Sequence, residues 1–104
     1  MIIAKNMLLS EHADVETWRH ALLHRRKKVE FMVMVIHPEH LYPMEIMSSK
    51  EFLRADADDI RYRVVGMADG FGSAVKLVQQ AVEEVLKVDP QLMQLKQRLQ
   101  EIYI

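Results

Sequence analysis

One hydrophobic ladder dominates the second half of the chain. Its members recur in steps of three or four residues, the spacing that places side chains on one side of an α-helix. They are Ile60, Val64, Met67, Phe71, Val75, Val78, Val82 and Val85. All three glycines of the chain, Gly66, Gly70 and Gly72, lie inside this ladder. A helix must therefore either continue through the glycines or break at them.

If the helix continues, it spans residues 49–88. Three glycines in a helix interior cost roughly 3 kcal/mol relative to alanine, so a compensating contact is required. Gly66, Gly70 and Ser73 lie on one face of such a helix, where small residues allow a second helix to approach closely. We favour this interpretation, with the helix either unbroken or kinked.

Two other interpretations break the helix. In one, Asp69-Gly70 is a turn between two helices, and the segment resembles a DNA-binding helix-turn-helix, although Glu83-Glu84 would repel the DNA backbone. In the other, residues 60–65 form a strand, and residues 66–73 form a phosphate-binding loop before a helix. We rank this last interpretation lowest, because the glycine spacing matches neither of the established phosphate-loop motifs.

The first half of the chain carries another apolar stripe with helical spacing. A helix begins at Ser10 or Asp14, since both residues suit an N-cap, and the stripe continues in phase to Ile36. Residues 29–36 are also consistent with a buried strand, because short runs rich in Val and Ile do not distinguish the two structures. We favour the helix, which ends before a loop at residues 37–43.

Two further helix starts are marked in the sequence. Ser48-Ser49-Lys50-Glu51 is a capping box, and Asp89-Pro90 combines a cap with a proline at the first helical position. The last helix is expected from Pro90 to about Tyr103. A narrow apolar seam runs along it, formed by Leu92, Leu95, Leu99 and Ile102.

These patterns together predict an all-α fold, with residues 1–104 forming a single helical domain. Three or four helices form an antiparallel bundle, and the long or kinked helix through residues 49–88 runs along it. Because a thin layer of two long helices leaves one apolar side uncovered, we expect a second copy to complete the core.

Composition narrows the choice of compartment and partner. The chain has 14 Lys and Arg against 15 Asp and Glu, so no net positive field attracts nucleic acid, and we expect none to bind. The chain has no cysteine, which suits a reducing cytoplasm. The longest apolar run, residues 31–36, is far shorter than the roughly 20 residues of a membrane-spanning helix. We expect a soluble cytoplasmic protein with no membrane partner.

Histidines and basic residues supply the few candidate sites. Glu16, His20 and His24 recur at every fourth residue and form a weak candidate for a metal site. We prefer a solvated helix face, and we expect no metal and no cofactor. The one dense basic run suits phosphate or an acidic partner and consists of Arg25, Arg26, Lys27 and Lys28.

Catalytic motifs and paired nucleophiles and bases are absent from the sequence, so we expect no enzymatic activity. The sequence predicts a small interaction or regulatory module that acts through self-association as a homodimer, with an unidentified protein as a second option for partner. The expected partner surfaces are Gly66, Gly70 and Ser73, and the seam of Leu92, Leu95, Leu99 and Ile102. A DNA-binding regulator and a His/Glu metal-binding protein are the alternatives.

Overall fold

The computed structural model describes residues 1–104 and shows an α/β fold, so the all-α prediction is wrong. In chain order the elements are β1 (Ile2–Leu9), α1 (Val15–Leu23), β2 (Met32–Ile36), β3 (Glu45–Ser48), α2 (Ser49–Ala55), β4 (Arg63–Ala68), α3 (Phe71–Leu86) and α4 (Leu95–Ile102). The four strands form one sheet in the order β1-β4-β2-β3. β4 runs parallel to β1 and antiparallel to β2, and β3 is antiparallel to β2.

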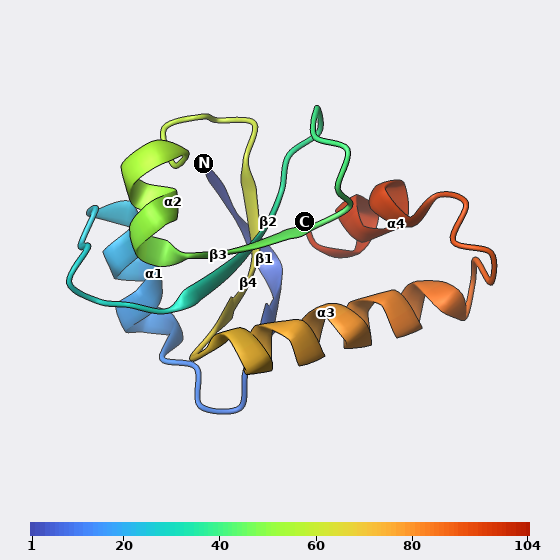
Figure 1. Ribbon diagram of the computed structural model, residues 1–104, viewed down its shortest axis with the longest axis horizontal. Helices are drawn as coiled ribbons and strands as arrows, with labels where there is room; N and C mark the ends of the chain where they lie inside the picture. Colours follow the sequence, from blue (N-terminus) through green and yellow to red (C-terminus); the bar gives the residue numbers. More distant parts are fainter.

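Helices cover both faces of the sheet (Figure 1). α1 and α2 pack on one face around a core that includes Trp18 and Phe52, and α3 and α4 pack on the other around Leu77 and Leu99. The apolar side chains of the sheet are therefore buried within one chain. The all-helical core that a second copy was expected to complete is therefore absent, and self-association stays a prediction. None of the helices has the length and apolar character needed to cross a membrane.

The prediction of one helix over residues 49–88 is wrong, because the middle of this segment is a strand. α2 ends at Ala55, β4 occupies the next apolar segment, and α3 begins at Phe71. Residues 64–68 are all buried, because β4 has a strand on each side and a helix layer on each face. A strand buried on both faces is apolar at every position, so it fits helical spacing as well as strand spacing.

Gly66 lies where β4 comes unusually close to both neighbouring strands. It lies opposite Leu8 of β1 and Met34 of β2, next to register shifts in both pairings. An added Cβ atom would lie 2.3 Å from the terminal methyl of Met34 and 3.1 Å from the Leu8 carbonyl oxygen. The glycine therefore permits a close approach of three strands, which is a common reason for glycine inside a sheet.

The helix-turn-helix interpretation is also wrong, because Met67 and Ala68 lie in β4 and not in a helix. The observed order is a strand, a short turn at residues 69–70 and a helix, which is the order of elements in the interpretation that we ranked lowest. The loop that it placed over residues 66–73 is not present, because residues 66–68 belong to β4 and residues 71–73 to α3. The strand begins three residues later than that interpretation placed it.

Several local predictions are confirmed. Asp14 caps α1 by accepting the Thr17 N–H (3.3 Å), and Ser48 caps α2 by accepting the Glu51 N–H (3.2 Å). Residues 37–43 form a loop, as predicted from Pro38 and Pro43.

Other local predictions are wrong. The stretch before residue 37 contains strand β2, not the end of a helix. α4 begins at Leu95 rather than Pro90, because Asp89 closes a turn by accepting the Leu92 N–H at its carbonyl and the Gln94 N–H at its carboxylate. β1 was not predicted at all.

Candidate functional site

The parallel strands β1 and β4 end side by side at Leu9 and Ala68. After β1 the chain passes to the face covered by α1, whereas after β4 it passes to the opposite face, covered by α3 (Figure 1). Neighbouring parallel strands whose connections leave in opposite directions create a crevice beyond their carboxyl ends. Open α/β sheets bind their ligands at such topological switch points.

A crevice of about 420 Å³ lies at this switch point. One wall comes from the end of β1 and the other from α3, and the lining residues are Leu9, Ser10, Glu11, Ser73, Lys76, Leu77 and Gln80. Ser10 joins the two sides, because its N–H donates to the Met67 carbonyl (3.2 Å) and its hydroxyl accepts the Asp69 N–H (3.2 Å). The lining is thus mostly polar, with one ammonium and one carboxylate group.

The first turn of α3 supplies backbone donors beside the crevice, which Ser73 of this turn lines. The first bond within the helix runs from the Ala74 N–H to the Gly70 carbonyl (3.0 Å), so the amides of residues 71–73 have no acceptor within the helix. Unlike α1 and α2, α3 has neither a side-chain cap nor an acidic residue in its first turn. Together with the Lys76 ammonium, these amides make this side of the crevice favourable for an anion.

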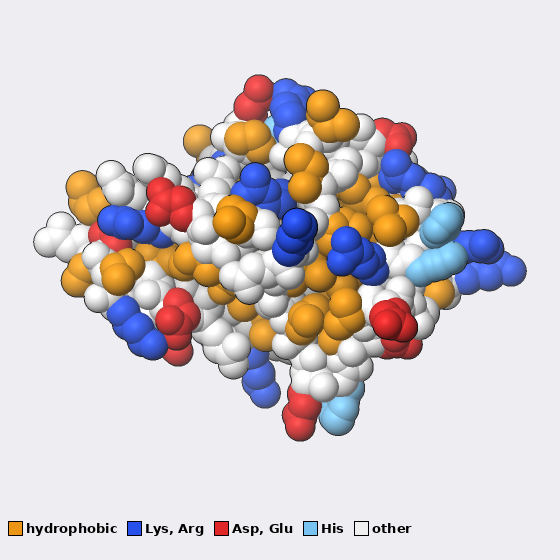
Figure 2. Space-filling view, turned by 180° about the vertical axis from the view of Figure 1, so that it is seen from behind, with side chains coloured by type: hydrophobic (Ala, Val, Ile, Leu, Met, Phe, Trp, Pro, Cys, Tyr) orange, Lys and Arg blue, Asp and Glu red, His pale blue; other side chains and the backbone are white.

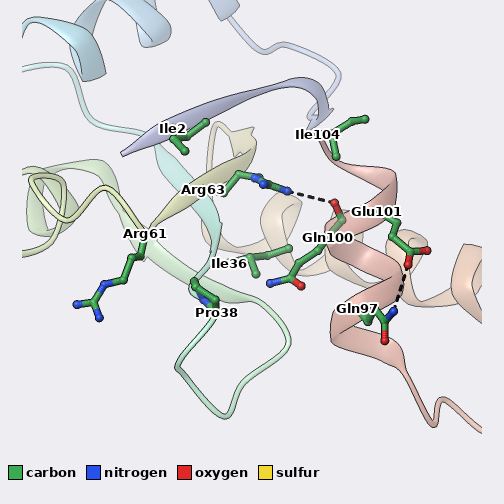
Figure 3. Close-up of a pocket in the computed structure, with 9 residues that line it drawn as sticks. All are labelled: Ile2, Ile36, Pro38, Arg61, Arg63, Gln97, Gln100, Glu101 and Ile104. Carbon is green, nitrogen blue, oxygen red and sulfur yellow. Dashed lines mark hydrogen bonds between the residues drawn. The ribbon is translucent and has the colours of Figure 1, made fainter.

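A second hollow of about 410 Å³ lies under α4, at the opposite end of β1 and β4 (Figure 3). Its two cations are already engaged. Arg63 donates to the carbonyls of Gln100 (3.1 Å) and Tyr103 (3.5 Å) at the end of α4. Arg61 points away from the hollow (Figure 3) and pairs with Asp59 and Glu39. We therefore assign this hollow a structural role, since its arginines hold α4 and a neighbouring loop in place.

The loop after β2 is fixed by a polar network around His37, which is only 3% exposed. The Glu39 N–H donates to Nδ1 of His37 (3.1 Å), so Nε2 carries the proton and donates to the Asp59 carboxylate (3.0 Å). Arg61 donates to the same carboxylate through its side chain (3.0 Å) and its backbone N–H (2.9 Å). The bonds from Arg61, followed by the one from His37, hold the pKa of Asp59 well below its ordinary value.

His40 extends this network. Its ring stacks on that of His37 with centroids 3.9 Å apart, and its Nδ1 lies 2.5 Å from the Glu45 carboxylate. Tyr62 packs edge-on against both rings, and burial raises the pKa of its phenol. Lys96 of α4 donates to the His40 carbonyl. The network therefore joins the β2–β3 loop to the segment just before β4 and to α4, and both ring nitrogens of His37 are used in holding it.

The structure places the residues of the metal hypothesis at the surface. Glu16 and His20 are exposed on α1, and His24 is its C-cap residue. The rings of His20 and His24 have centroids 4.1 Å apart. No group of three or more His, Cys, Asp or Glu side chains is arranged to hold a metal ion.

The predicted basic run follows α1 and is fully at the surface. Figure 2 shows Lys and Arg side chains beside histidines at the end of the molecule where Figure 1 places α1. Arg25 pairs with Asp58 (2.6 Å), whereas the other three cations, at positions 26–28, form no ion pair. The run lies on the α1 side of the sheet, away from the crevice beside α3.

The residues expected to meet a partner are separated by the observed fold. Gly66 and Leu99 are buried in the core of the chain itself. The other five are half-buried, two at the start of α3 and three on or just before α4, namely Gly70, Ser73, Leu92, Leu95 and Ile102. Gly70 and Ser73 lie at the crevice end of α3, so the structure gives them a different setting from the helix face in which they were predicted.

Sequence reasoning missed the crevice because it missed β1. Ser10 was interpreted as a helix cap. The available signal was the apolar segment of residues 2–9, interrupted only by Lys5-Asn6 and ended by Ser10-Glu11, which is typical of a strand followed by a loop.

Fold and crevice together define a small α/β protein with an open mixed sheet and a candidate ligand site at its topological switch point. No protein family, curated protein or solved structure matches this chain. Its function is therefore argued from the geometry of the crevice.

Proposed function

We propose that this chain is a small cytoplasmic binding module, and not an enzyme, which takes a phosphate- or carboxylate-bearing ligand in the crevice between β1 and α3. The observation that supports this proposal is the topological switch between two neighbouring parallel strands, with a crevice of about 420 Å³ at that position. The lack of cysteine is in keeping with a reducing compartment.

The lining indicates how a ligand would lie. Its anionic group would face the amides of residues 71–73, with the Lys76 ammonium neutralising charge and the hydroxyls of Ser10 and Ser73 at hand to donate. Leu9 and Leu77 offer contact for an apolar part of the ligand.

Glu11 restricts the class of ligand. Its carboxylate on the crevice wall repels further negative charge, so a monophosphate or a carboxylate with an apolar body fits better than a polyphosphate. Glu11 is also the only carboxylate in the lining, and no histidine accompanies it to form an acid–base pair. We therefore propose that the crevice binds a ligand and does not catalyse a reaction.

The proposal is tested by titrating ¹⁵N-labelled protein with inorganic phosphate and with phenyl phosphate while the amide resonances are followed by NMR. We expect saturable chemical-shift changes centred on residue 10 and residues 71–73. The dissociation constant for phosphate should be about 1 mM, which corresponds to a binding free energy of about 4 kcal/mol. Phenyl phosphate should bind more tightly, because its ring can contact Leu9 and Leu77.

A matched pair of variants controls for general electrostatics. Lys76→Gln should weaken binding about three- to tenfold, whereas Lys87→Gln, which removes the same charge at the far end of α3, should have little effect. Equal effects of the two variants would show that only net charge matters. Shifts confined to residues 25–28 would place the anion on the basic run and refute the crevice.

A further inference from the structure

The crevice between β1 and α3 is lined by two charged side chains of opposite sign. Glu11 follows β1 and Lys76 lies on α3, so the two belong to different walls. Figure 1 shows the loop after β1 beside the start of α3. Neither side chain takes part in the ion pairs of this chain, and the two do not pair with each other. The crevice therefore holds a free carboxylate and a free ammonium group.

The sequence of α3 leaves Lys76 without a partner on its own helix. A helical lysine reaches the side chains three and four positions away. Around Lys76 these are Gly72, Ser73, Gln79 and Gln80. None of them is acidic, whereas Lys87, just after the last turn of α3, pairs with Glu84 (2.9 Å). The Lys76 ammonium is thus available to an anionic group in the crevice.

The backbone that carries Glu11 is held to the sheet. Ser10, the preceding residue, donates its N–H to the Met67 carbonyl (3.2 Å) and accepts the Asp69 N–H at its hydroxyl (3.2 Å). The Ala13 N–H then donates to the Ser10 carbonyl (3.1 Å), which closes a turn that contains Glu11. Because these bonds already fix the turn, a ligand of Glu11 does not have to order it on binding.

We infer that the ligand of the crevice is an α-amino acid with an apolar side chain, whose carboxylate binds Lys76 and whose ammonium group binds Glu11. This inference rests on the proposed function and narrows its ligand class. A ligand with both charges gives each of the two protein charges a counter-ion, whereas an anion satisfies Lys76 and is repelled by Glu11. The amino group therefore distinguishes the expected ligand from other carboxylates.

The remaining lining suits the side chain of such a ligand. Leu9 is 39% exposed and Leu77 is 7% exposed, and both contribute apolar surface to the crevice. The volume of about 420 Å³ lies within the range of about 300–1,000 Å³ that is usual for small-molecule sites. The crevice thus offers a place for each of the three parts of an apolar amino acid.

The test compares two ligands that differ only in the ammonium group, L-phenylalanine and 3-phenylpropionate. Each is titrated into ¹⁵N-labelled protein while the amide resonances are followed by NMR. We expect both ligands to shift the resonances of residues 9–11 and 76–77. The dissociation constant should be about three- to tenfold lower for phenylalanine, because exposed ion pairs are weak individually.

Glu11→Gln removes the carboxylate and keeps the size of the side chain. In this variant phenylalanine should bind no more tightly than phenylpropionate, whose own affinity should stay the same or rise because the repulsion is gone. Glu16→Gln is the matched control, since Glu16 is exposed on α1 and does not line the crevice. It should leave the ratio of the two dissociation constants unchanged.

The outcomes distinguish this inference from the proposed function. If phosphate or phenylpropionate shifts the crevice resonances but phenylalanine binds no more tightly than phenylpropionate, the inference is wrong and the proposed function stands. If none of the three ligands shifts these resonances, both are wrong. An advantage of phenylalanine that persists in Glu11→Gln would show that another group binds the ammonium, which overturns the role of Glu11.

Discussion

Gly66→Ala tests the packing at the centre of the sheet. The added methyl group would lie 2.3 Å from the terminal methyl of Met34, 3.1 Å from the Leu8 Cβ atom and 3.1 Å from the Leu8 carbonyl oxygen. Met34 has a flexible end, but it is fully buried and can move only by displacing other core atoms. The Leu8 carbonyl is backbone, so it can move only if β1 moves.

The expected cost follows from two opposing effects. Overpacking a core costs about 1–3 kcal/mol, and replacing glycine returns about 0.5–1 kcal/mol by restricting the unfolded chain. We therefore expect Gly66→Ala to lower the free energy of unfolding by about 1–2 kcal/mol, which lowers the melting temperature by about 5–15 °C for a domain of this size. Urea unfolding followed by Trp18 fluorescence measures the free energy of unfolding, and thermal unfolding followed by circular dichroism measures the melting temperature.

Gly72→Ala is the matched control. A Cβ atom at Gly72 would meet nothing within 4 Å, and Gly72 lies inside α3 without a positive φ angle. Alanine there should raise the free energy of unfolding by about 0.5–1 kcal/mol.

A double substitution separates a local clash from a general loss of stability. Met34→Val removes the methyl group that obstructs Gly66→Ala, so the second substitution should cost less in that background, with a coupling of at least about 0.5 kcal/mol. The reasoning is refuted if Gly66→Ala is neutral or stabilising in the parent chain, or if it costs the same in both backgrounds.

Two further predictions concern acid stability and α4. Because the folded-state pKa of Asp59 is below its ordinary 3.8, its ionised form stabilises the fold above that value, and the stabilisation is lost as the pH falls. The melting temperature should therefore drop less steeply below about pH 5 in Asp59→Asn than in the parent chain, and identical profiles would contradict the assigned bonds to Arg61 and His37. Leu99→Ala should lower the free energy of unfolding by about 2–5 kcal/mol, since Leu99 is only 1% exposed. Chemical unfolding at a concentration where the chain is monomeric measures this cost, and a loss below about 1 kcal/mol would mean that Leu99 is not a core residue.

How much of the fold could be predicted depends on how local its signals are. The caps at Asp14 and Ser48 were found from sequence because a cap is specified within four residues. The ladder from Phe71 onward correctly indicated a helix, although only Val85 of its members belongs to the buried face, which also contains Ala74, Leu77 and Ala81. The same ladder misled at Val64 and Met67, which lie in β4, where burial on both faces removes the alternation that identifies a strand.

The candidate site could not be predicted from local signals. It requires β1 and β4 to lie side by side, although some 60 residues separate Ile2 from its partner Arg63. Neither strand contains a sequence pattern that identifies the other as its partner in the sheet. Ser73 was noticed in the sequence, but the crevice that it shares with Ser10 and Lys76 exists only after the sheet has formed.

The central position of β4 also affects how the chain is made. β4 separates β1 from β2 in the sheet, yet it is the last of the four strands to be synthesised. At a synthesis rate of about 5–20 residues per second, about 3–12 s pass between the synthesis of β1 and that of β4, its only neighbour in the sheet. During that interval its isoleucines and leucines are open to chaperones and to other nascent chains. Slowing translation upstream of residue 63 should therefore lower the soluble yield of this protein more than slowing it downstream of residue 68.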